Sequence, residues 1–389
     1  MKIKGEFYLS KVPILDKNKR IFAQRLNLKN KENKPLTSSE FARILANLRF
    51  DKLFGRHKVF VHIMPDLLTN NILDYLNEEK LIFALDEKLL SEEDFLRIKD
   101  IKEVGFSFAI KKMDYERSER ELKLFDFFVY PKEIALTNAS YKDKVIITDI
   151  SNLVELNKYI EKGFKYFYGD FIFKDVVIGR TITPKRRAII ELFNRIKDKY
   201  DPNEVENILK KNPDLSLSLL KYVNSAAFYL PTRITTIRRA ITILGQKKLL
   251  QWILLYLYTS DEEESLYSET LLELAAERGK MLEVLAEKLN LDNERIDKAF
   301  LVGVFSFVDK LLKMSREEIK EEFNIDDEIY LALVKHEGIL GKLLYIAENI
   351  EKEEIFELNK ELEEVNLQIP DVIQAQMKAY AWFEGVELK

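Results

Sequence analysis

The stretch at residues 214–258, DLSLSLLKYVNSAAFYLPTRITTIRRAITILGQKKLLQWILLYLY, decides the fold of the C-terminal half of this chain. Apolar residues recur there at helical spacing on both sides of a polar turn at Asn224-Ser225, where short side chains compete for backbone hydrogen bonds. The Thr-Thr pair predicts the start of a second helix, and Gly245 predicts its end. A third helix over residues 246–258 is apolar on nearly every face, which predicts burial in a helical core.

Two segments of this stretch carry a family resemblance. LLKYVNSAAF at residues 219–228 and TTIRRAITILG at residues 235–245 are similar to the signature segments of the HDOD domain. That domain is an all-helical relative of the HD hydrolases and occurs in bacterial signalling proteins. The resemblance marks as structural signature positions Asn224, Ser225, Arg239, Leu244 and Gly245.

The residues themselves indicate what the signature does. Asn224 is expected to stabilise a turn, and a ligand contact is the weaker alternative. Leu244-Gly245 predicts a tight corner between helices, where a side chain on the glycine would clash. In the adjacent Arg238-Arg239 pair, we expect one guanidinium to pair with an acid such as Asp214 or Glu283 and the other to face solvent.

Length and composition bound the class of protein. A chain of 389 residues favours two domains, and 47% hydrophobic and 33% charged residues are enough for real cores. The net charge of -4 predicts no binding to nucleic acid or to a membrane surface. The chain has no cysteine, which excludes disulfides and thiolate chemistry. With no leader or membrane span expected at the sequence level, a cytoplasmic location is predicted.

The first part of the chain, to residue 178, alternates short β-rich runs with charged segments of helical length. This alternation predicts a parallel sheet closed into a compact or incomplete α/β barrel. Helices are expected at residues 39–48 and 91–102. Strands are expected at residues 7–9, 59–64, 81–85, 105–110, 127–129, 145–148 and 166–167.

Everything after residue 179 is expected to be helical, so the predicted domains are 1–178 and 179–389. Thr183-Pro184 predicts the first helix start. The tail over residues 369–383 carries aromatic residues that we expect to pack on the helical core, with a partner site as the alternative. The other expected helices cover residues 186–199, 203–210, 266–289, 293–314, 327–335, 338–349 and 352–365.

The first part resembles EAL domains, the barrels of cyclic-di-GMP phosphodiesterases, over about residues 5–178. The resemblance rests on VFVHIMPDLL, LIFALDEKLL, VGFSFAI and GFKYFYGDF. It implies a TIM-type barrel in which active relatives hold two divalent cations with carboxylates and one Asn at the strand ends. This chain departs from that pattern at Gln24, Leu28, His62, Ala84, Lys111, Lys112, Val129, Pro131, Asp149, Asn152 and Tyr168.

The departures predict loss of the metal site, because the Asp-Asp pair of the pattern becomes Lys111-Lys112 and two ammonium groups repel a divalent cation. Lys111 and Lys112 form a candidate anion-binding site at a strand end. The plainer interpretation is that they are solvated, or bonded to Asp114 or Glu116. Binding of cyclic-di-GMP without hydrolysis is a possible but unfavoured expectation.

The second part also lacks the groups of its ancestral site. In the HD hydrolases that it resembles, an adjacent His-Asp pair binds metal, and here those positions carry Ser306 and Phe307. His336 is the single histidine of the helical part and is expected at the C-terminal end of a helix rather than as a ligand. We therefore expect no metal, no cofactor and no catalytic residue.

Together these patterns predict a non-catalytic signalling scaffold or adaptor that acts through contacts with other proteins and is possibly homo-oligomeric. The alternative is a sensor that binds cyclic-di-GMP, or another anionic nucleotide, at the altered barrel mouth. An active phosphodiesterase is the least favoured reading.

Overall fold

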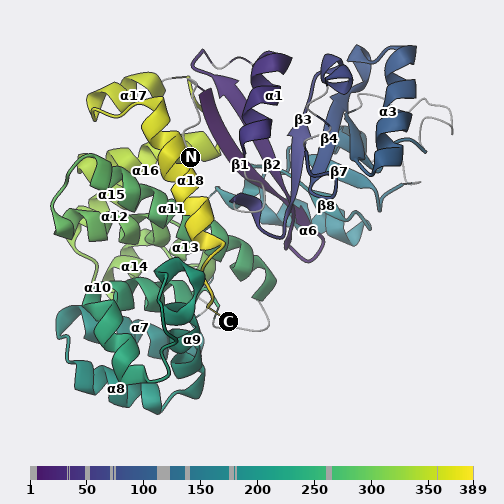
Figure 1. Cartoon of the computed structure of the whole chain (residues 1–389). Coiled ribbons are helices and arrows are strands. Elements are labelled where there is room, and N and C mark those ends of the chain that lie inside the picture. The colour runs from purple at the N-terminus through teal and green to yellow at the C-terminus, as the bar shows by residue number, and fades with distance from the viewer. Residues whose placement is uncertain are drawn as a thin grey trace. The chain divides into compact units, whose positions relative to one another are not determined.

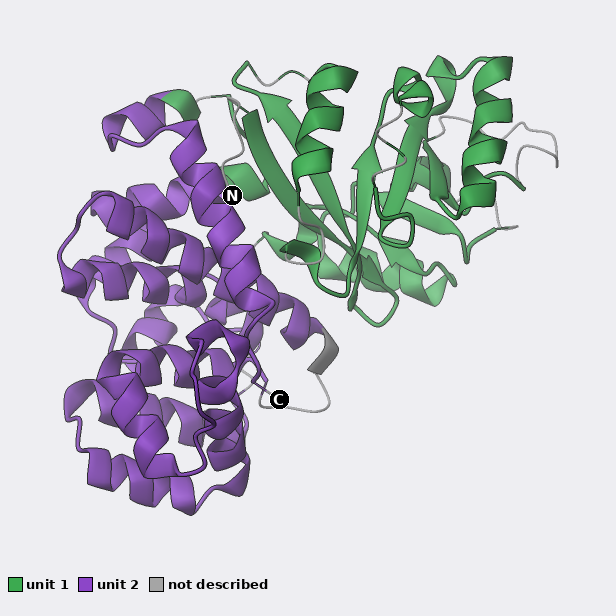
Figure 2. Cartoon of the chain, viewed as in Figure 1, with its two compact units in different colours: residues 1–174, 349–359 green, residues 175–348, 360–389 purple. Residues whose placement is uncertain are grey.

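A computed structural model of the chain describes residues 7–388 except 33, 35, 49–52, 71, 72, 74, 75, 112–122, 136–140, 175–178, 180, 181, 260–264 and 357. The chain forms two compact units (Figure 2). Unit 1 comprises residues 1–174 and 349–359, and unit 2 comprises residues 175–348 and 360–389. The chain thus leaves unit 1 after Lys174 and returns to it for residues 349–359, a return for which the sequence carries no signal.

Unit 1 is a closed barrel whose strands follow one another around the ring in chain order (Figure 1). The seven expected strands are confirmed, and the ten-residue β2 is one that the sequence analysis missed. The prediction of a compact α/β barrel is therefore correct, and the barrel is complete. Its strands are β1 (Phe7–Asp16), β2 (Ile21–Asn30), β3 (Lys58–His62), β4 (Leu81–Asp86), β5 (Ser107–Lys111), β6 (Phe127–Pro131), β7 (Val145–Thr148) and β8 (Tyr166–Phe167).

The expectation of an all-parallel sheet is wrong at β1, which runs antiparallel to both β2 and β8. The cause is the short connection between β1 and β2, because a parallel pair needs a crossover of a dozen residues or more. Asp16 closes this hairpin: its carboxylate accepts hydrogen bonds from the backbone N–H groups of Asn18 and Arg20. Lys19 supplies the left-handed residue, with φ 63°.

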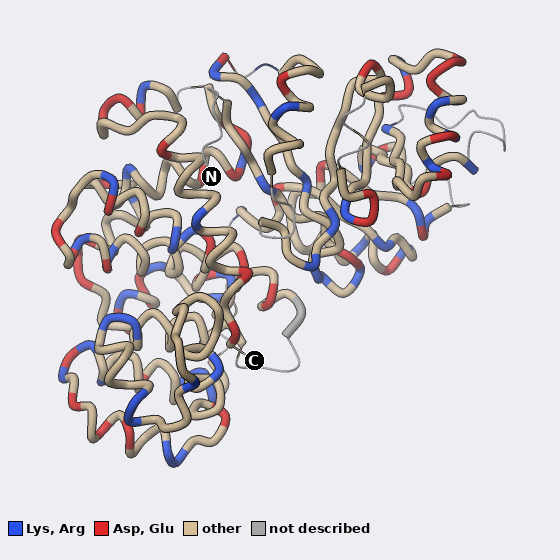
Figure 3. Tube along the Cα trace, viewed as in Figure 1, with Lys and Arg blue, Asp and Glu red and all other residues tan. Residues whose placement is uncertain are grey.

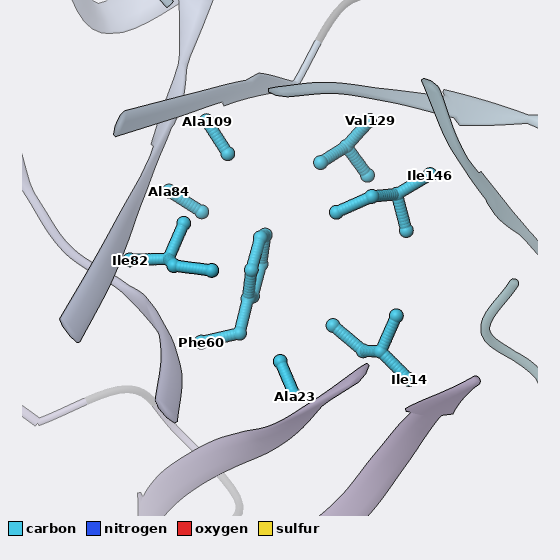
Figure 4. Close-up of a cluster of buried hydrophobic side chains, with 8 residues drawn as sticks. All are labelled: Ile14, Ala23, Phe60, Ile82, Ala84, Ala109, Val129 and Ile146. Carbon is cyan, nitrogen blue, oxygen red and sulfur yellow. The ribbon is translucent and has the colours of Figure 1, made fainter. Parts of the chain in front are cut away.

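The interior of the barrel is filled by apolar side chains from seven of its strands (Figure 4). Phe60 lies near the centre of this layer, with small residues around it on neighbouring strands. Such a packed interior supports side chains at its ends and leaves no pore. The layer consists of Ile14, Ala23, Phe60, Ile82, Ala84, Ala109, Val129 and Ile146.

Helices of unit 1 connect its strands, and two begin with capping boxes. Thr37 and Ser91 each accept a hydrogen bond from the third helical residue, as their positions before charged amphipathic segments predict. The elements are α1 (Ser38–Asn47), η1 (Pro65–Thr69), η3 (Glu87–Leu89), α3 (Glu92–Val104), α5 (Lys132–Ala135), α6 (Leu153–Glu161) and η4 (Asp170–Ile172).

Unit 2 is helical throughout the residues that the structure describes, as predicted. Helix α11 is its centre and packs along both α12 and α18. Its elements are α7 (Pro184–Asp198), α8 (Pro202–Lys210), α9 (Pro213–Asn224), η5 (Ala226–Phe228), α10 (Ile237–Leu257), α11 (Ser265–Lys288), α12 (Asn293–Phe305), α13 (Val308–Leu312), α14 (Arg316–Glu322), α15 (Asp327–Lys335), α16 (Gly338–Glu351), α17 (Leu358–Glu364) and α18 (Ile369–Phe383).

The crossing of α11 and α12 depends on two glycines that approach each other closely. A Cβ atom on Gly303 would lie 2.5 Å from the Cα atom of Gly279. Any larger residue at either position would push the helices apart, so this crossing requires glycine on both sides. The aromatic tail α18 packs on the same core, with Met377 and Tyr380 buried.

Two of the expected helices are shorter than predicted. The helix expected over residues 293–314 divides into α12 and α13 at Ser306-Phe307, and the helix expected over residues 352–365 begins only at Leu358. In the second case the residues before Leu358 belong to unit 1, so tertiary packing overrides a helical pattern there. Figure 3 shows basic and acidic residues interspersed along both units, in keeping with the small net charge.

Candidate functional site

The candidate site is the end of the barrel at which the parallel strands finish, here called the barrel mouth. Side chains alternate between the two faces of a strand, so residues two positions beyond the interior layer also point inward. Ala23, Phe60, Ala84 and Ala109 belong to that layer (Figure 4). With the residue after β8, the barrel mouth therefore comprises Arg25, His62, Asp86, Lys111 and Tyr168.

This alternation corrects the expected alignment of the first strand. Gln24, taken as the counterpart of the Glu in Glu-Ala-Leu, lies on the face of β2 opposite to Ala23 and Arg25, as does Leu28. The inward position at the mouth is Arg25, a cation. A pattern match without the strand register cannot distinguish these faces, because a shift of one residue exchanges them.

Arg25 makes the central contacts of the barrel mouth. Its Nη1 atom donates to the hydroxyl oxygen of Tyr168 at 2.5 Å and to Oε1 of Glu353 at 2.6 Å. The guanidinium also lies 4.9 Å from the centre of the Tyr168 ring, a cation–π distance. Burial raises the pKa of Tyr168, although Arg25 opposes that effect. The phenol is therefore neutral and accepts the arginine's hydrogen bond.

His62 lies between the two cations of the barrel mouth. Desolvation by neighbouring residues lowers the pKa of His62 below its ordinary value, and the positive charges of Lys111 and Arg25 lower it further. The negative charge of Asp86 acts in the opposite direction. The imidazole is therefore neutral near pH 7 and becomes charged only on acidification. Lys111 at the end of β5 is exposed and pairs in register with Asp86 of β4. Lys112, Asp114 and Glu116 lie outside the described residues.

The remaining positions of the EAL pattern are placed as follows. Ala84 and Val129 belong to the packed interior layer and cannot reach a ligand. Asp149 accepts a hydrogen bond from the Thr148 hydroxyl at 2.6 Å. Asn152 caps α6 by accepting from the backbone of Glu155 at 2.8 Å. Capping explains Asn152 fully, so the structure gives it a local role in the backbone.

Residues 349–359, here called the barrel strap, complete the barrel mouth. Its Glu353 accepts from Arg25 and, at 3.1 Å, from the hydroxyl of Ser10 on β1. At the other end of the strap, Asn359 accepts a 2.7 Å hydrogen bond from Tyr8 and donates to the backbone oxygen of Lys31. The strap thus places a carboxylate of this chain against the arginine of the barrel mouth.

Unit 2 contains a second cation, which contacts the two residues at the expected His-Asp positions. Arg278 of α11 is only 3% exposed. It donates to the Ser306 hydroxyl at 2.6 Å, lies 4.0 Å from the centre of the Phe307 ring and is 3.5 Å from Glu348. Ser306 and Phe307 are the residues at the expected His-Asp positions. We call Arg278, Ser306, Phe307 and Glu348 the buried corner.

Further polar contacts hold the buried corner in place. Arg316 donates to the backbone oxygens of Phe305 and Ser306 and lies 3.0 Å from Asp309. His336 is the left-handed residue that ends α15, as expected for a residue at a helix C-terminus, and its Nε2 atom is 3.3 Å from Glu348. These contacts use the backbone that joins α12 to α13, so they fix the break between those helices.

The signature residues of the HDOD segments have mainly backbone surroundings. Asn224 donates to the backbone oxygens of Leu220 at 2.7 Å and Ile234 at 2.8 Å, and its side-chain oxygen accepts from the Ile234 N–H at 2.7 Å. The hydroxyl of Ser225 donates to the Tyr222 oxygen. Leu244 is buried, while Arg239 is exposed. These bonds join the end of α9 to the segment before α10.

One expectation about this region is wrong. The backbone does leave the helical region at Gly245, with φ 64° and ψ 179°, but a Cβ atom there would meet nothing within 4 Å. The glycine is required by its backbone angles and not by a clash. The expectation for the arginine pair is confirmed with another partner: Arg238 pairs with Glu206 at 2.7 Å instead of Asp214 or Glu283, and Arg239 is exposed.

The sequence analysis missed three site residues, Arg25, Glu353 and Arg278. The inward position of Arg25 could have been predicted, because Ile21, Ala23 and Arg25 alternate with the outward residues of a strand. The role of Glu353 could not, because its contact with Arg25 joins residues 328 positions apart in the chain. Arg278 lies in a long helix whose burial could be predicted, but its partners are distant in the chain.

Among the residues that the structure describes, no three His, Asp or Glu side chains are grouped so that they could hold a metal ion. No helix among them is both long enough and apolar enough to span a membrane.

A family model matches the helical part of the chain. The model of the HDOD domain matches residues 183–324. Cyclic di-GMP phosphodiesterase CdgJ of Vibrio cholerae is 29% identical over 237 residues, which is 60% of this chain and 54% of that protein. The chain thus spans about half the length of that relative. The uncharacterized protein YuxH of Bacillus subtilis is 22% identical over 88% of this chain and 90% of its own length.

Among solved structures, the chain is similar to an EAL domain protein from Listeria monocytogenes, with 16% identity and a TM-score of 0.33. That likeness covers 43% of this chain and 87% of the other. The chain thus combines a closed eight-stranded barrel with a helical part in which residues 183–324 match the HDOD domain.

Proposed function

We propose that this chain is a non-catalytic signalling protein of the cyclic-di-GMP network, which works through contacts with other proteins. The observation that carries the proposal is the charge of the barrel mouth. Arg25 and Lys111 point into it, and after desolvation their charges are the next causes that lower the pKa of His62. Their positions are those at which the family resemblance implies metal-binding carboxylates.

Electrostatics explains why this arrangement disfavours a hydrolase. A single positive charge about 5 Å from a divalent cation costs about 7 kcal/mol at an effective dielectric constant of about 20. The mouth holds Asp86 and, from the barrel strap, Glu353, which is already paired with Arg25, whereas a hard cation needs several oxygen ligands. Two-metal activation of water for attack on a phosphodiester therefore has no support in these side chains.

The buried corner of unit 2 supports the same proposal. Next to the positions at which the HD family would bind metal, the guanidinium of Arg278 supplies a positive charge. It donates a hydrogen bond to Ser306 and forms an ion pair with Glu348. Both ancestral sites thus have a fixed positive side chain. In this proposal the protein recognises partners and changes its contacts, and a second copy of the chain is one candidate partner.

The competing reading is that the chain hydrolyses cyclic-di-GMP, as the name of the Vibrio cholerae relative states for that protein. Incubation of the full chain with cyclic-di-GMP and excess Mn²⁺ or Mg²⁺, followed by chromatography of the products, separates the two readings. We expect no linear dinucleotide above the level of a no-protein control. Turnover that is lost in Asp86→Asn would overturn the proposal.

A second candidate function is sensing of an anion without hydrolysis, and it is favoured by the same convergence of Arg25, Lys111 and His62. Guanidinium and ammonium groups at one end of a barrel suit a phosphodiester. Cyclic-di-GMP is the first ligand to titrate, by calorimetry. Saturable micromolar binding that is lost in Lys111→Ala would favour the sensor over the pure scaffold.

A further inference from the structure

We propose that Glu353 is an internal ligand of the barrel mouth, which occupies Arg25 until an external anion displaces it and frees the barrel strap. This proposal rests on the second candidate function, the anion sensor, and adds its regulation. It assigns a role to a carboxylate that lies far from the barrel in sequence and that neither family resemblance includes.

The first observation is the chemistry of the contact. The carboxylate of Glu353 lies 2.6 Å from Nη1 of Arg25, and Ser10 donates to the same oxygen at 3.1 Å. A carboxylate oxygen held by a guanidinium and a hydroxyl imitates the way such groups bind an oxygen of a phosphate. An external anion that used Arg25 would therefore need the position that Glu353 occupies.

The second observation is the backbone of Glu353, which has a φ of 62°. The left-handed region is uncommon for residues other than glycine, asparagine and aspartate, and it is unfavourable for a glutamate. Here it belongs to the turn that ends α16, where the amides of Glu353 and Glu354 donate to the backbone oxygens of Ile350 and Asn349. This turn presents the carboxylate to Arg25, and the ion pair adds to the backbone bonds that hold the turn closed.

The third observation is that the strap has a second attachment that does not involve the mouth. Asn359 bonds Tyr8 and Lys31, while Ile355 and Leu358 are buried. Displacement of Glu353 therefore loosens one end of the strap and leaves the other attached. Such a local opening is reversible and does not require unit 1 to unfold.

The consequence follows from the course of the chain. Residues 338–348 of α16 and 360–364 of α17 belong to unit 2, so the strap is continuous with unit 2 at both ends. An anion that displaces Glu353 changes how that connecting segment is held. Occupancy of the barrel mouth is thereby coupled to the conformation of the barrel strap, which connects α16 to α17.

The test uses the full chain and cyclic-di-GMP as the probe, with pyrophosphate as a second anion. Glu353→Gln removes the competing charge and should tighten binding about tenfold, because the binding-competent state is then populated without prior opening. Glu354→Gln is the matched control: it makes the same charge change in the same strap, on an exposed side chain. Arg25→Ala should abolish the gain, and thermal unfolding checks that each variant is folded.

Hydrogen exchange gives an independent measure of the strap. The amides of Glu353, Glu354 and Leu358 donate to Ile350, Asn349 and Ile355, and they report whether this segment is closed. We expect faster exchange at these amides in Glu353→Gln and in the wild type saturated with the probe, and no change in Glu354→Gln.

The outcomes separate the two proposals. Equal affinity in the wild type and Glu353→Gln, with unchanged exchange on binding, would leave the anion sensor standing and overturn the internal ligand. Absence of binding to either probe in every variant would overturn the anion sensor and the competition together. In that case faster exchange in Glu353→Gln would identify Glu353 as a structural contact only.

Discussion

Arg25 at the barrel mouth and Arg278 at the buried corner are both cations at places where related hydrolases are implied to hold metal, but their surroundings differ. The Arg25 side chain is 26% exposed and its carboxylate partner is 18% exposed. Arg278 is 3% exposed and lies against an aromatic ring. Water can replace the partner of the first arginine but not those of the second. Burial thus decides whether a substituted cation remains available for exchange or becomes part of the core.

The largest effect is expected for Arg278→Met. This change leaves Glu348 and the Ser306 hydroxyl without their buried partner, and breaking a buried charge pair costs about 3–5 kcal/mol. Urea unfolding followed by circular dichroism measures the loss. Arg295→Met is the control, because Arg295 forms exposed pairs with Asp292 and Glu328 and should cost about 0.5 kcal/mol. A cost for Arg278→Met as small as that of the control would break the comparison.

Asn224→Ala should follow, with a loss of about 2–3 kcal/mol. It removes three hydrogen bonds, each worth about 1 kcal/mol, and leaves the backbone groups of the buried Ile234 unsatisfied. Asn212→Ala, which removes one exposed side-chain bond to Ile208, should cost much less. An Asn224→Ala protein with wild-type stability that no longer recruits a partner would show that this turn serves binding.

A smaller loss, about 1 kcal/mol or less, is expected for Arg25→Ala and for Lys111→Ala, because partly exposed charges keep water as an alternative partner. The same urea titration applies, and Lys34→Ala, which removes an exposed pair with Glu32, gives the baseline. If Arg25→Ala destabilised the protein as much as Arg278→Met, the contacts of Arg25 would be structural, and the proposal that it is available to bind an anion would be contradicted.

The smallest effect concerns pH. The pKa of His62 is lowered in the folded state, so the folded protein binds this proton less readily than the unfolded chain. The stability that His62 contributes is therefore present above its ordinary pKa of about 6.5 and is lost as pH falls through the lower folded value. His62→Gln should flatten this part of the stability profile. For an anion at the mouth the sign is opposite, and affinity should rise as pH falls.

The main architecture could be predicted from the sequence because its signals are local. Strand runs separated by charged helices predict a barrel, and the turn at Asn224-Ser225 with the glycine at 245 predicts the helical corners. The missed strand β2 contains Ala23, Gln24 and Arg25, whose side chains have low strand propensity, and it is stabilised by its neighbours in the sheet.

The candidate site could be predicted only in part, for two physical reasons. Strand register determines that Arg25 and not Gln24 faces inward, and register is a property of the whole barrel. The partner of Arg25 comes from a segment whose sequence favours a helix, yet residues 352–356 have no helical structure and belong to unit 1. Lys111 could be identified because it ends a clear β-rich run.

The return of residues 349–359 to unit 1 has a consequence for how this protein can be inherited or engineered. A gene cut near codon 178 would separate Arg25, Ser10 and Tyr8 from Glu353 and Asn359, the residues that they bond. Exchange of the HDOD half alone by recombination would have the same result unless the incoming half carried matching residues in its own connecting segment. The barrel is thus not a free module, and its sequence is expected to evolve together with the eleven residues 349–359, which are encoded far downstream of it.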